Sequence, residues 1–512
     1  MSSIGLLFGL LLTWAFGIAC LAALPGTAGR TAAPGGPAWM IGAGGLAGVF
    51  LATLWLRALS FAGIAFSIWS IALPLLAATL ALGLWAASRQ PYRLRDAFRD
   101  ARHTVWGALS GRSLDSTARI LWCLLLAWLA VRFALLFAEV ATRPLYPWDS
   151  WTQWATKARV WYEQGRIVPF VRVDEWFAAG GTSYIDAGPH YPGTVGLIQV
   201  LACTFLGRWD DTLMNLSFWM LAVAFAIAVY GALRAMELDA LWALAGTWLV
   251  SSLPLVNAHV ALAGYADLPL AMYFCLAILA FMRWLKSREP ADGALALLLL
   301  AACPLLKVPG RIWAFLAVPA LLVGLLPRRG PHIVGAGYLI AALGLLLLAQ
   351  TDPLLMGYRL HLDFAPDWEA LANSFLLYDN WHLLWYGAVA VALLGRKHLL
   401  APGVAPLTAV VAGGVMFLAF VLMFTNAREW VSDQTTVNRA SLHLAPLIVI
   451  WMLMVFRAWA LSLAAAASTP EGVEPPIDTI AEVATGATTD VAPAAPTNAA
   501  PDATPPAAPV AP

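Results

Sequence analysis

A carboxylate, a cation and several indoles stand close together in the segment 146–159. Asp149, Gln153 and Lys157 follow one another at intervals of four residues, which would place them on one face of a helix. Three tryptophans lie among them: Trp148, Trp151 and Trp154. A carboxylate can accept the proton of a hydroxyl group, a cation can bind a phosphate group, and an indole can stack on a sugar ring. The segment therefore has the residues expected at the rim of a site for hydroxyl and phosphate chemistry.

A helix start at the membrane surface would explain part of this pattern. Asp149 or Ser150 could cap the first turn, and tryptophans commonly gather where a helix leaves the bilayer. Such an aromatic belt requires the rings but neither the acid nor the base beside them. We therefore favour the site, with Asp149 as the residue that accepts a proton, and keep the helix cap as the alternative.

Further polar residues stand where apolar runs begin or end. Asp267 heads an apolar run directly after Tyr265 and Ala266, where a role as helix N-cap is an equal alternative. Lys307 and Arg311 flank a Pro-Gly turn that needs neither cation, which favours phosphate binding over snorkelling of these side chains to the membrane surface. The candidates for substrate binding are Trp148, Trp151, Lys157, His190, Tyr191, Tyr265, Asp267, Lys307, Arg311 and Arg439.

The five cysteines lie in or beside apolar runs, without a CxxC spacing or a neighbouring histidine cluster. They are interpreted as small buried residues, so that neither a disulfide framework nor a zinc site is expected. The sequence contains no Walker loop and no GxGxxG motif, which disfavours an ATP-driven pump. No cofactor is predicted, although the residues do not exclude a divalent metal.

The composition is that of a membrane protein. Of 512 residues, 61% are hydrophobic and only 12% are charged, and the mean hydropathy is +0.75. Soluble domains contain about twice this charged fraction. Apolar runs that are long enough, or nearly so, to cross about 30 Å of hydrocarbon recur along the chain. Examples are 4–24, 61–87, 120–140, 213–233, 335–349 and 404–424. We therefore predict an all-α polytopic protein whose surroundings are membrane lipids, with no nucleic-acid partner.

Arginines predict the orientation of the chain. Seven of them crowd the connection 88–119, which marks it as cytoplasmic and, with apolar residues at helical spacing, predicts an amphipathic helix on the inner leaflet. The loops 141–190, 351–381 and 426–440 then face outward. The apolar segment 193–207 has only 15 residues and is expected not to cross. About 13 crossings follow, with a miscount of one span as the alternative.

Three regions result. Residues 1–119 contain N-terminal membrane helices and the basic loop, and residues 120–463 form the membrane domain with the three outward loops. Residues 464–512 form an Ala/Pro/Thr-rich tail that is expected to be disordered, because it has no periodic apolar pattern. The tail contains six acids and no base, and since the net charge is +1, the membrane domain has +7, which suits contact with anionic lipid and phosphate.

The order of these features resembles the GT-C membrane glycosyltransferases. Between residues 120 and 330 the chain has an acid after an outward span, a Tyr191-Pro192 element, a Tyr-Ala-Asp-Leu-Pro patch at 265–269 and a Lys307-x-x-Gly310 turn. The closest likeness is to bacterial members that use polyprenyl-phosphate sugars, relatives of protein mannosyltransferases and aminoarabinose transferases. The resemblance implies a GT-C-like bundle with a large first outer loop and Asp149 as general base. The sequence departs from the family in the turn, which is often Lys-Asn-Glu-Gly, and in a single first-loop acid.

These observations predict an inverting glycosyltransferase of the inner (plasma) membrane with its site on the periplasmic face. It would move a sugar from a polyprenyl-phosphate donor to an outward-facing envelope lipid, glycan or protein. A transporter or flippase of lipid-linked sugars is the first alternative; it would be expected to show inverted repeats, which the sequence does not reveal. A non-catalytic assembly protein for envelope glycans is the second, and it would not need Asp149.

Overall fold

The structure is a computed structural model that describes residues 2–26, 33–89, 111, 114–178, 180–186, 188–348, 351–352, 354–355, 358–359 and 364–468. Helices dominate these residues, and the strands are two short pairs. Strand β1 (Phe170–Val171) pairs with β2 (Tyr184–Ile185) in parallel, and β3 (Leu354–Leu355) pairs with β4 (Tyr358–Arg359) antiparallel. The predicted all-α polytopic class is confirmed.

Nine helices of the described residues are long and apolar enough to cross a membrane. They are α1 (Ser2–Ala23), α3 (Gly36–Phe61), α4 (Ile68–Ser88), α6 (Ser116–Thr142), α10 (Leu216–Ala235), α13 (Asp267–Ser287), α17 (Gly330–Leu348), α20 (Ala405–Phe424) and α22 (Ala445–Ser468). The pair α11 (Ala240–Ser252) and α12 (Pro254–Ala261) is bent by 61° and would make a tenth span if counted as one. The protein is therefore a multi-pass membrane protein.

Shorter elements connect these helices. The shorter apolar helices are α9 (Thr194–Leu206), α14 (Pro290–Leu306), α15 (Gly310–Phe315), α16 (Ala317–Leu325) and α19 (Leu384–Leu394). The remaining ones are η1 (Ser150–Ala155), α7 (Thr156–Gln164), α8 (Val173–Ala178), η2 (Leu213–Asn215), α18 (Trp368–Ala372), η3 (Asn373–Leu377), η4 (Arg396–His398), η5 (Asn426–Trp430) and α21 (Thr435–Leu442). Of these, η1 and η3 are π-helices.

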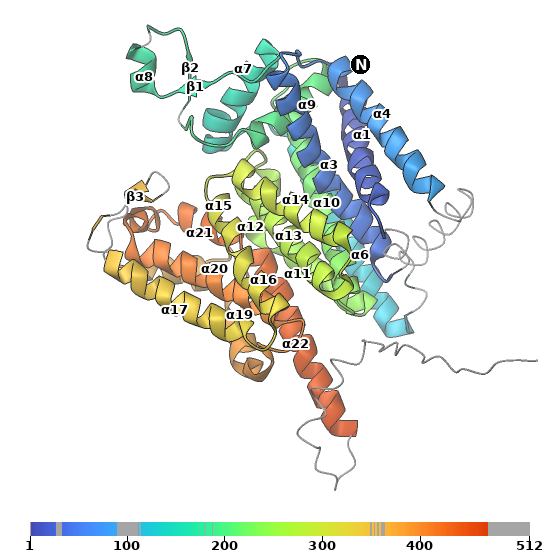
Figure 1. Ribbon diagram of the computed structural model, residues 1–512, viewed down its shortest axis with the longest axis vertical. Helices are drawn as coiled ribbons and strands as arrows, with labels where there is room; N and C mark the ends of the chain where they lie inside the picture. Colours follow the sequence, from blue (N-terminus) through green and yellow to red (C-terminus); the bar gives the residue numbers. More distant parts are fainter. Residues whose placement is uncertain are drawn as a thin grey trace, which may run out of the picture. The chain divides into compact units, whose positions relative to one another are not determined.

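The most buried helices are α3, α10 and α13, which lie between their neighbours in Figure 1. Small residues allow the helices to approach closely, as is usual in membrane proteins. A Cβ atom on Gly48 of α3 would lie 2.1 Å from the carbonyl oxygen of Thr13 in α1, and one on Gly42 would lie 2.2 Å from the backbone nitrogen of Ala228 in α10. Helices α16, α17 and α20 form a second group, drawn in yellow and orange.

Helix α9 begins and ends at one end of the bundle. At its start, Arg57 near the end of α3 donates a hydrogen bond from Nη2 to Thr194 Oγ1 at 3.1 Å. Near its end, Phe205 packs against Gly5 at the start of α1. Helices α1 and α3 are antiparallel neighbours, since Thr13 faces Gly48, so the start of α1 and the end of α3 lie at the same end. This is the geometry expected of a segment that does not cross the bilayer.

Two sequence predictions meet the limits of the described residues. The amphipathic helix in 88–119 falls largely outside them; α6 begins at Ser116, where Asp115 caps it by accepting a hydrogen bond from the Ala118 nitrogen at 2.9 Å. The first residues assigned to the tail, from 464, still belong to helix α22, which continues to Ser468. Residues 464–467 are alanines, the best helix formers, and they extend the last helix. The tail beyond lies outside the described residues.

Candidate functional site

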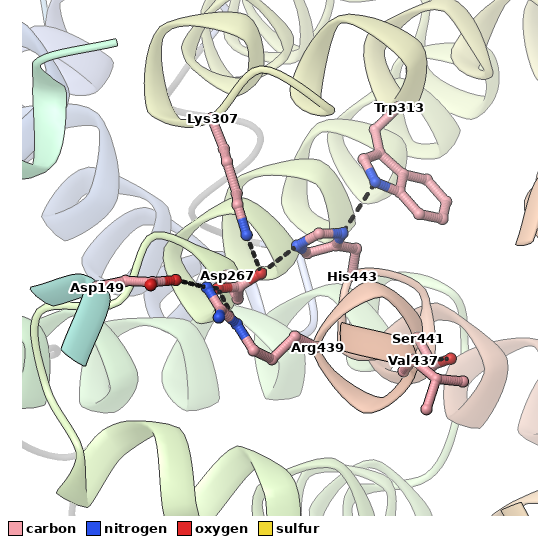
Figure 2. A network of polar contacts seen from close by, with 8 residues as sticks. All are labelled: Asp149, Asp267, Lys307, Trp313, Val437, Arg439, Ser441 and His443. Carbon is pink, nitrogen blue, oxygen red and sulfur yellow. Dashed lines mark hydrogen bonds and ion pairs between the residues drawn. The ribbon is translucent and has the colours of Figure 1, made fainter. Parts of the chain in front are cut away.

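The carboxylate of Asp267 is the centre of a buried polar network (Figure 2). It is fully buried, at the first residue of α13. Its Oδ1 accepts hydrogen bonds from Lys307 Nζ at 2.5 Å and from His443 Nε2 at 3.1 Å. Its Oδ2 accepts from Arg439 Nε at 3.1 Å and Nη2 at 3.0 Å. The N-cap position of α13 belongs to Ala266 and Asp267 follows it in the first turn, so the N-cap alternative is wrong. The buried charge is compensated by four hydrogen bonds instead.

Lys307 reaches Asp267 because the chain turns sharply after α14. The backbone of Lys307 is extended at the helix end, and α15 begins three residues later at Gly310. A Cβ atom at Gly310 would lie 1.9 Å from the carbonyl oxygen of Cys303, so only glycine fits this turn. The Lys307 amine therefore points at α13. Burial lowers the pKa of this amine, and the Asp267 carboxylate opposes that shift.

Arg439 connects two carboxylates. From α21 its Nη2 atom lies 3.0 Å from Asp267 Oδ2 and 2.6 Å from Asp149 Oδ2. The guanidinium also lies over the ring of Tyr265, 4.5 Å from its centroid. Burial acts to lower the pKa of Arg439, but the two carboxylates outweigh burial and raise it, so that the guanidinium remains charged.

Asp149 forms the more exposed side of this network. Its side chain is 26% exposed, against 0% for that of Asp267. It stands at the N-cap position of η1 but makes no capping hydrogen bond, so the helix-cap alternative does not hold for Asp149. Its Oδ2 atom instead pairs with Arg439, and its Oδ1 atom makes no hydrogen bond to a described residue.

The predicted common face of Asp149, Gln153 and Lys157 is wrong for Lys157. The lysine is buried; its amine pairs with Asp186 Oδ2 at 2.8 Å and donates to the Gly188 carbonyl at 2.7 Å. The cause is the π-helix η1, which replaces the i→i+4 spacing over residues 150–155. Burial lowers the pKa of Lys157 despite its partner Asp186. This lysine holds the connection between α7 and α9 and is absent from the network around Asp267.

The aromatic residues divide into two sets. Trp148 and Trp151 are exposed beside Asp149, with ring centroids 5.0 Å apart in an edge-to-face arrangement. Trp154 is buried and packs perpendicular to Tyr191. The exposed His190 also contacts Tyr191, with ring centroids 4.8 Å apart. Only the first two indoles are therefore accessible at the site.

His443 is a site residue that the sequence did not reveal. The indole nitrogen of Trp313 donates a hydrogen bond to His443 Nδ1 at 3.0 Å. An indole can only donate, so Nδ1 has no proton, and a neutral imidazole then has its proton on Nε2, which donates to Asp267. Burial lowers the pKa of His443, in agreement with a neutral ring. The available signal was its spacing of four residues from Arg439.

The charges of this network balance. Asp149 and Asp267 each contribute one negative charge, Lys307 and Arg439 each contribute one positive charge, and His443 is neutral. Arg311 is exposed and makes no ion pair with a described residue. Within the described part of the chain, no group of three or more His, Cys, Asp or Glu residues is arranged to hold a metal ion.

Fold and site together define a multi-pass helical membrane protein with a polar centre in which one arginine bridges two carboxylates. No protein-family model, curated protein or solved structure matches the chain.

Proposed function

We propose that the protein is a glycosyltransferase that moves a sugar from a polyprenyl phosphate to an envelope lipid, glycan or protein. The observation that supports this most is the setting of Asp149. One of its oxygens is fixed by Arg439, which is itself anchored on the buried Asp267, while Oδ1 makes no hydrogen bond to a described residue. A partly exposed carboxylate at the edge of this network, with one oxygen unbonded, can accept a proton from a hydroxyl group beside it.

The reaction then follows from this placement. An acceptor hydroxyl donates a hydrogen bond to Asp149 Oδ1 and passes its proton to that atom as its oxygen attacks the anomeric carbon of the donor. The bond between this carbon and the phosphate oxygen breaks, and the prenyl phosphate leaves with the bonding electrons. Attack on the face opposite the leaving group inverts the anomeric configuration. A single base is sufficient for this one-step displacement.

Cations and indoles at the site have matching roles. Arg439 Nη1 makes no hydrogen bond to a described residue, and Arg311 is exposed, so these two groups would bind the donor phosphate. Trp148 and Trp151 present exposed rings on which a sugar can stack. Lys307 supports the phosphate site indirectly, because its amine is committed to Asp267.

The proposed location is the inner membrane, with the site on the periplasmic face. Thirteen crossings would consist of the nine long spans, the bent α11–α12 pair and the shorter helices Pro290–Leu306, Gly310–Leu325 and Leu384–Leu394. The N-terminus would then lie outside and α22 would end in the cytoplasm. The return of α9 to the end of the bundle where it begins supports this arrangement.

The test compares cells with and without the gene by mass analysis of envelope glycans and lipid-linked sugars. Complementation with Asp149→Asn should lower transfer about 100- to 10,000-fold, the usual cost of removing a general base. Protein abundance in the membrane should stay normal. The matched control is Asp379→Asn, which changes an exposed carboxylate paired only with His382 among the described residues. Normal glycans with Asp149→Asn would refute the role of Asp149 as base. If the protein were a transporter, cells without the gene would accumulate lipid-linked sugar, and Asp149→Asn would not reproduce this accumulation.

A further inference from the structure

The two carboxylates that contact Arg439, Asp267 and Asp149, differ in their burial and in their number of partners. Asp267 is fully buried and receives two hydrogen bonds from Arg439, one from Lys307 and one from His443. Asp149 is partly exposed, and Arg439 is its only ion-pair partner among the described residues. If Asp267 left the guanidinium, its buried charge would lose a cationic partner in an environment without water. If Asp149 left it, water could solvate the partly exposed carboxylate. Asp149 is therefore the carboxylate that can be displaced.

A phosphate group that binds Arg439 would lie beside Asp149, the carboxylate that Arg439 holds more weakly. The bound anion and the Asp149 carboxylate would both lie within a few ångströms of one guanidinium, and like charges at this distance repel. The network itself has no surplus positive charge to compensate a further anion at Arg439, because its two cations already match its two carboxylates and the exposed Arg311 is not part of it. Phosphate binding is therefore favoured when Asp149 gives up its contact.

We propose that Asp149 and a phosphate monoester or diester compete for Arg439, so that binding of the phosphate releases Asp149 from the guanidinium. The inference rests on the proposed function where it equates this phosphate with that of the donor. A carboxylate that loses a cationic partner has a higher proton affinity. The base would thus be set free only after the donor has bound, and the acceptor hydroxyl would be activated second.

The experiment measures anion binding to the purified full-length protein in lipid nanodiscs by calorimetry, with farnesyl phosphate and inorganic phosphate as separate probes. Ionic strength is held constant, because salt screens these contacts. Asp149→Asn should bind the probe about fivefold more tightly than the wild type, the factor that corresponds to a lost competing ion pair of about 1 kcal/mol. Arg439→Gln should lose most of the binding. Asp379→Asn, the matched control, should bind like the wild type.

Each outcome decides the matter. Unchanged or weaker binding by Asp149→Asn, or no phosphate binding by any variant, overturns the competition. Asp149→Ser tests the same contact without the asparagine amide of Asp149→Asn, which could itself form a hydrogen bond to the anion. Thermal unfolding shows whether each variant is folded. Binding of both probes would indicate a free phosphate, whereas binding of farnesyl phosphate alone would indicate a lipid. Because no transfer is measured, tighter binding by Asp149→Asn would stand even if the cells showed no gene-dependent glycan.

Discussion

The four charged residues of the site have different physical roles. Asp267 cannot be buried without cations, and removing one partner of a buried ion pair typically costs about 3–5 kcal/mol. Lys307 and Arg439 are therefore required by Asp267 whether or not a ligand is present. The prediction that Lys307 binds the donor phosphate directly came from its place beside a turn; in the structure its amine serves the carboxylate of α13.

The neutral state of His443 leads to a prediction for pH. Its pKa is lowered in the folded protein by burial, whereas the pKa of an unfolded histidine is about 6.5. Above that pH, His443 is neutral in both the folded and the unfolded protein. Below it, His443 binds a proton in the unfolded chain but stays neutral in the folded protein. The contribution of His443 to stability is thus present above about pH 6.5 and is lost as the pH falls. His443→Gln should therefore show a smaller fall of the thermal midpoint between pH 7 and pH 5 than the wild type.

The measurement is thermal unfolding of both proteins in the same detergent across this range. Equal pH slopes for His443→Gln and the wild type would mean that His443 binds protons equally in both states. A Trp313→Phe variant tests the origin of the tautomer, because it removes the donor to Nδ1 and nothing else that bonds to the ring. Its site should tolerate acid better than the wild type, since Nδ1 would be free to accept a proton.

At the scale of residues, the sequence predicted which charged residues belong to the site. It predicted their contacts less well. Asp149, Asp267, Lys307 and Arg439 stand at the ends of apolar runs, and charges at such places mark sites because they are costly in hydrocarbon. Lys157 shared this signal but pairs with Asp186, a partner that the sequence does not indicate. His443 was missed because a single histidine is usually structural and its helix face is known only from the fold.

At the scale of elements, spacing failed where helices are irregular. The π-helix η1 moves Lys157 off the helix face that holds Asp149, and the residue types at 150–155 do not predict a π-helix. The break at Leu253-Pro254 turns one apolar run into two short helices, and α14 and α19 are shorter than a comfortable span. Apolar composition therefore predicted the class of fold well, and the count of crossings less directly.

The turn between α14 and α15 offers a test at this scale. Gly310→Ala would force a Cβ atom against the Cys303 carbonyl, so the turn must shift and draw Lys307 from Asp267. Overpacking of this kind costs about 1–3 kcal/mol. We expect a lower thermal midpoint and weaker phosphate binding. Gly83→Ala is the matched control, because its Cβ atom would meet nothing within 4 Å in α4; equal midpoints for the two variants would contradict the argument.

At the scale of the whole molecule, every functional proposal depends on which face of the membrane the polar centre occupies. Single cysteines at Thr182, Arg208 and Asp433, in a protein without its five native cysteines, should react with an impermeant thiol reagent on intact cells. These positions are exposed and lie beyond β1, at the end of α9 and before α21. A cysteine at the exposed Lys397 should react only after the membrane is opened.

Each position reports a different part of the topology. Protection of the cysteine at 208 alone would show that α9 crosses, which its two contacts with α1 and α3 argue against. Protection of the cysteine at 182 would place Asp149 in the cytoplasm and would remove the argument for a lipid-linked donor. Labelling at 397 on intact cells would contradict the positive-inside reading of the basic clusters.

The assembly of the polar centre from distant parts of the chain also sets an order in time. Lys307 follows Asp267 by 40 residues, whereas Arg439 follows it by 172. At about 5–20 residues per second, a ribosome makes Lys307 roughly 2 to 8 seconds after Asp267, and Arg439 only after roughly 9 to 34 seconds. During that interval Lys307 is the earliest of the network's cations to be synthesised after the buried acid. Lys307 would thus be available to compensate Asp267 before Arg439 has been made, and Asp149 would gain its partner last.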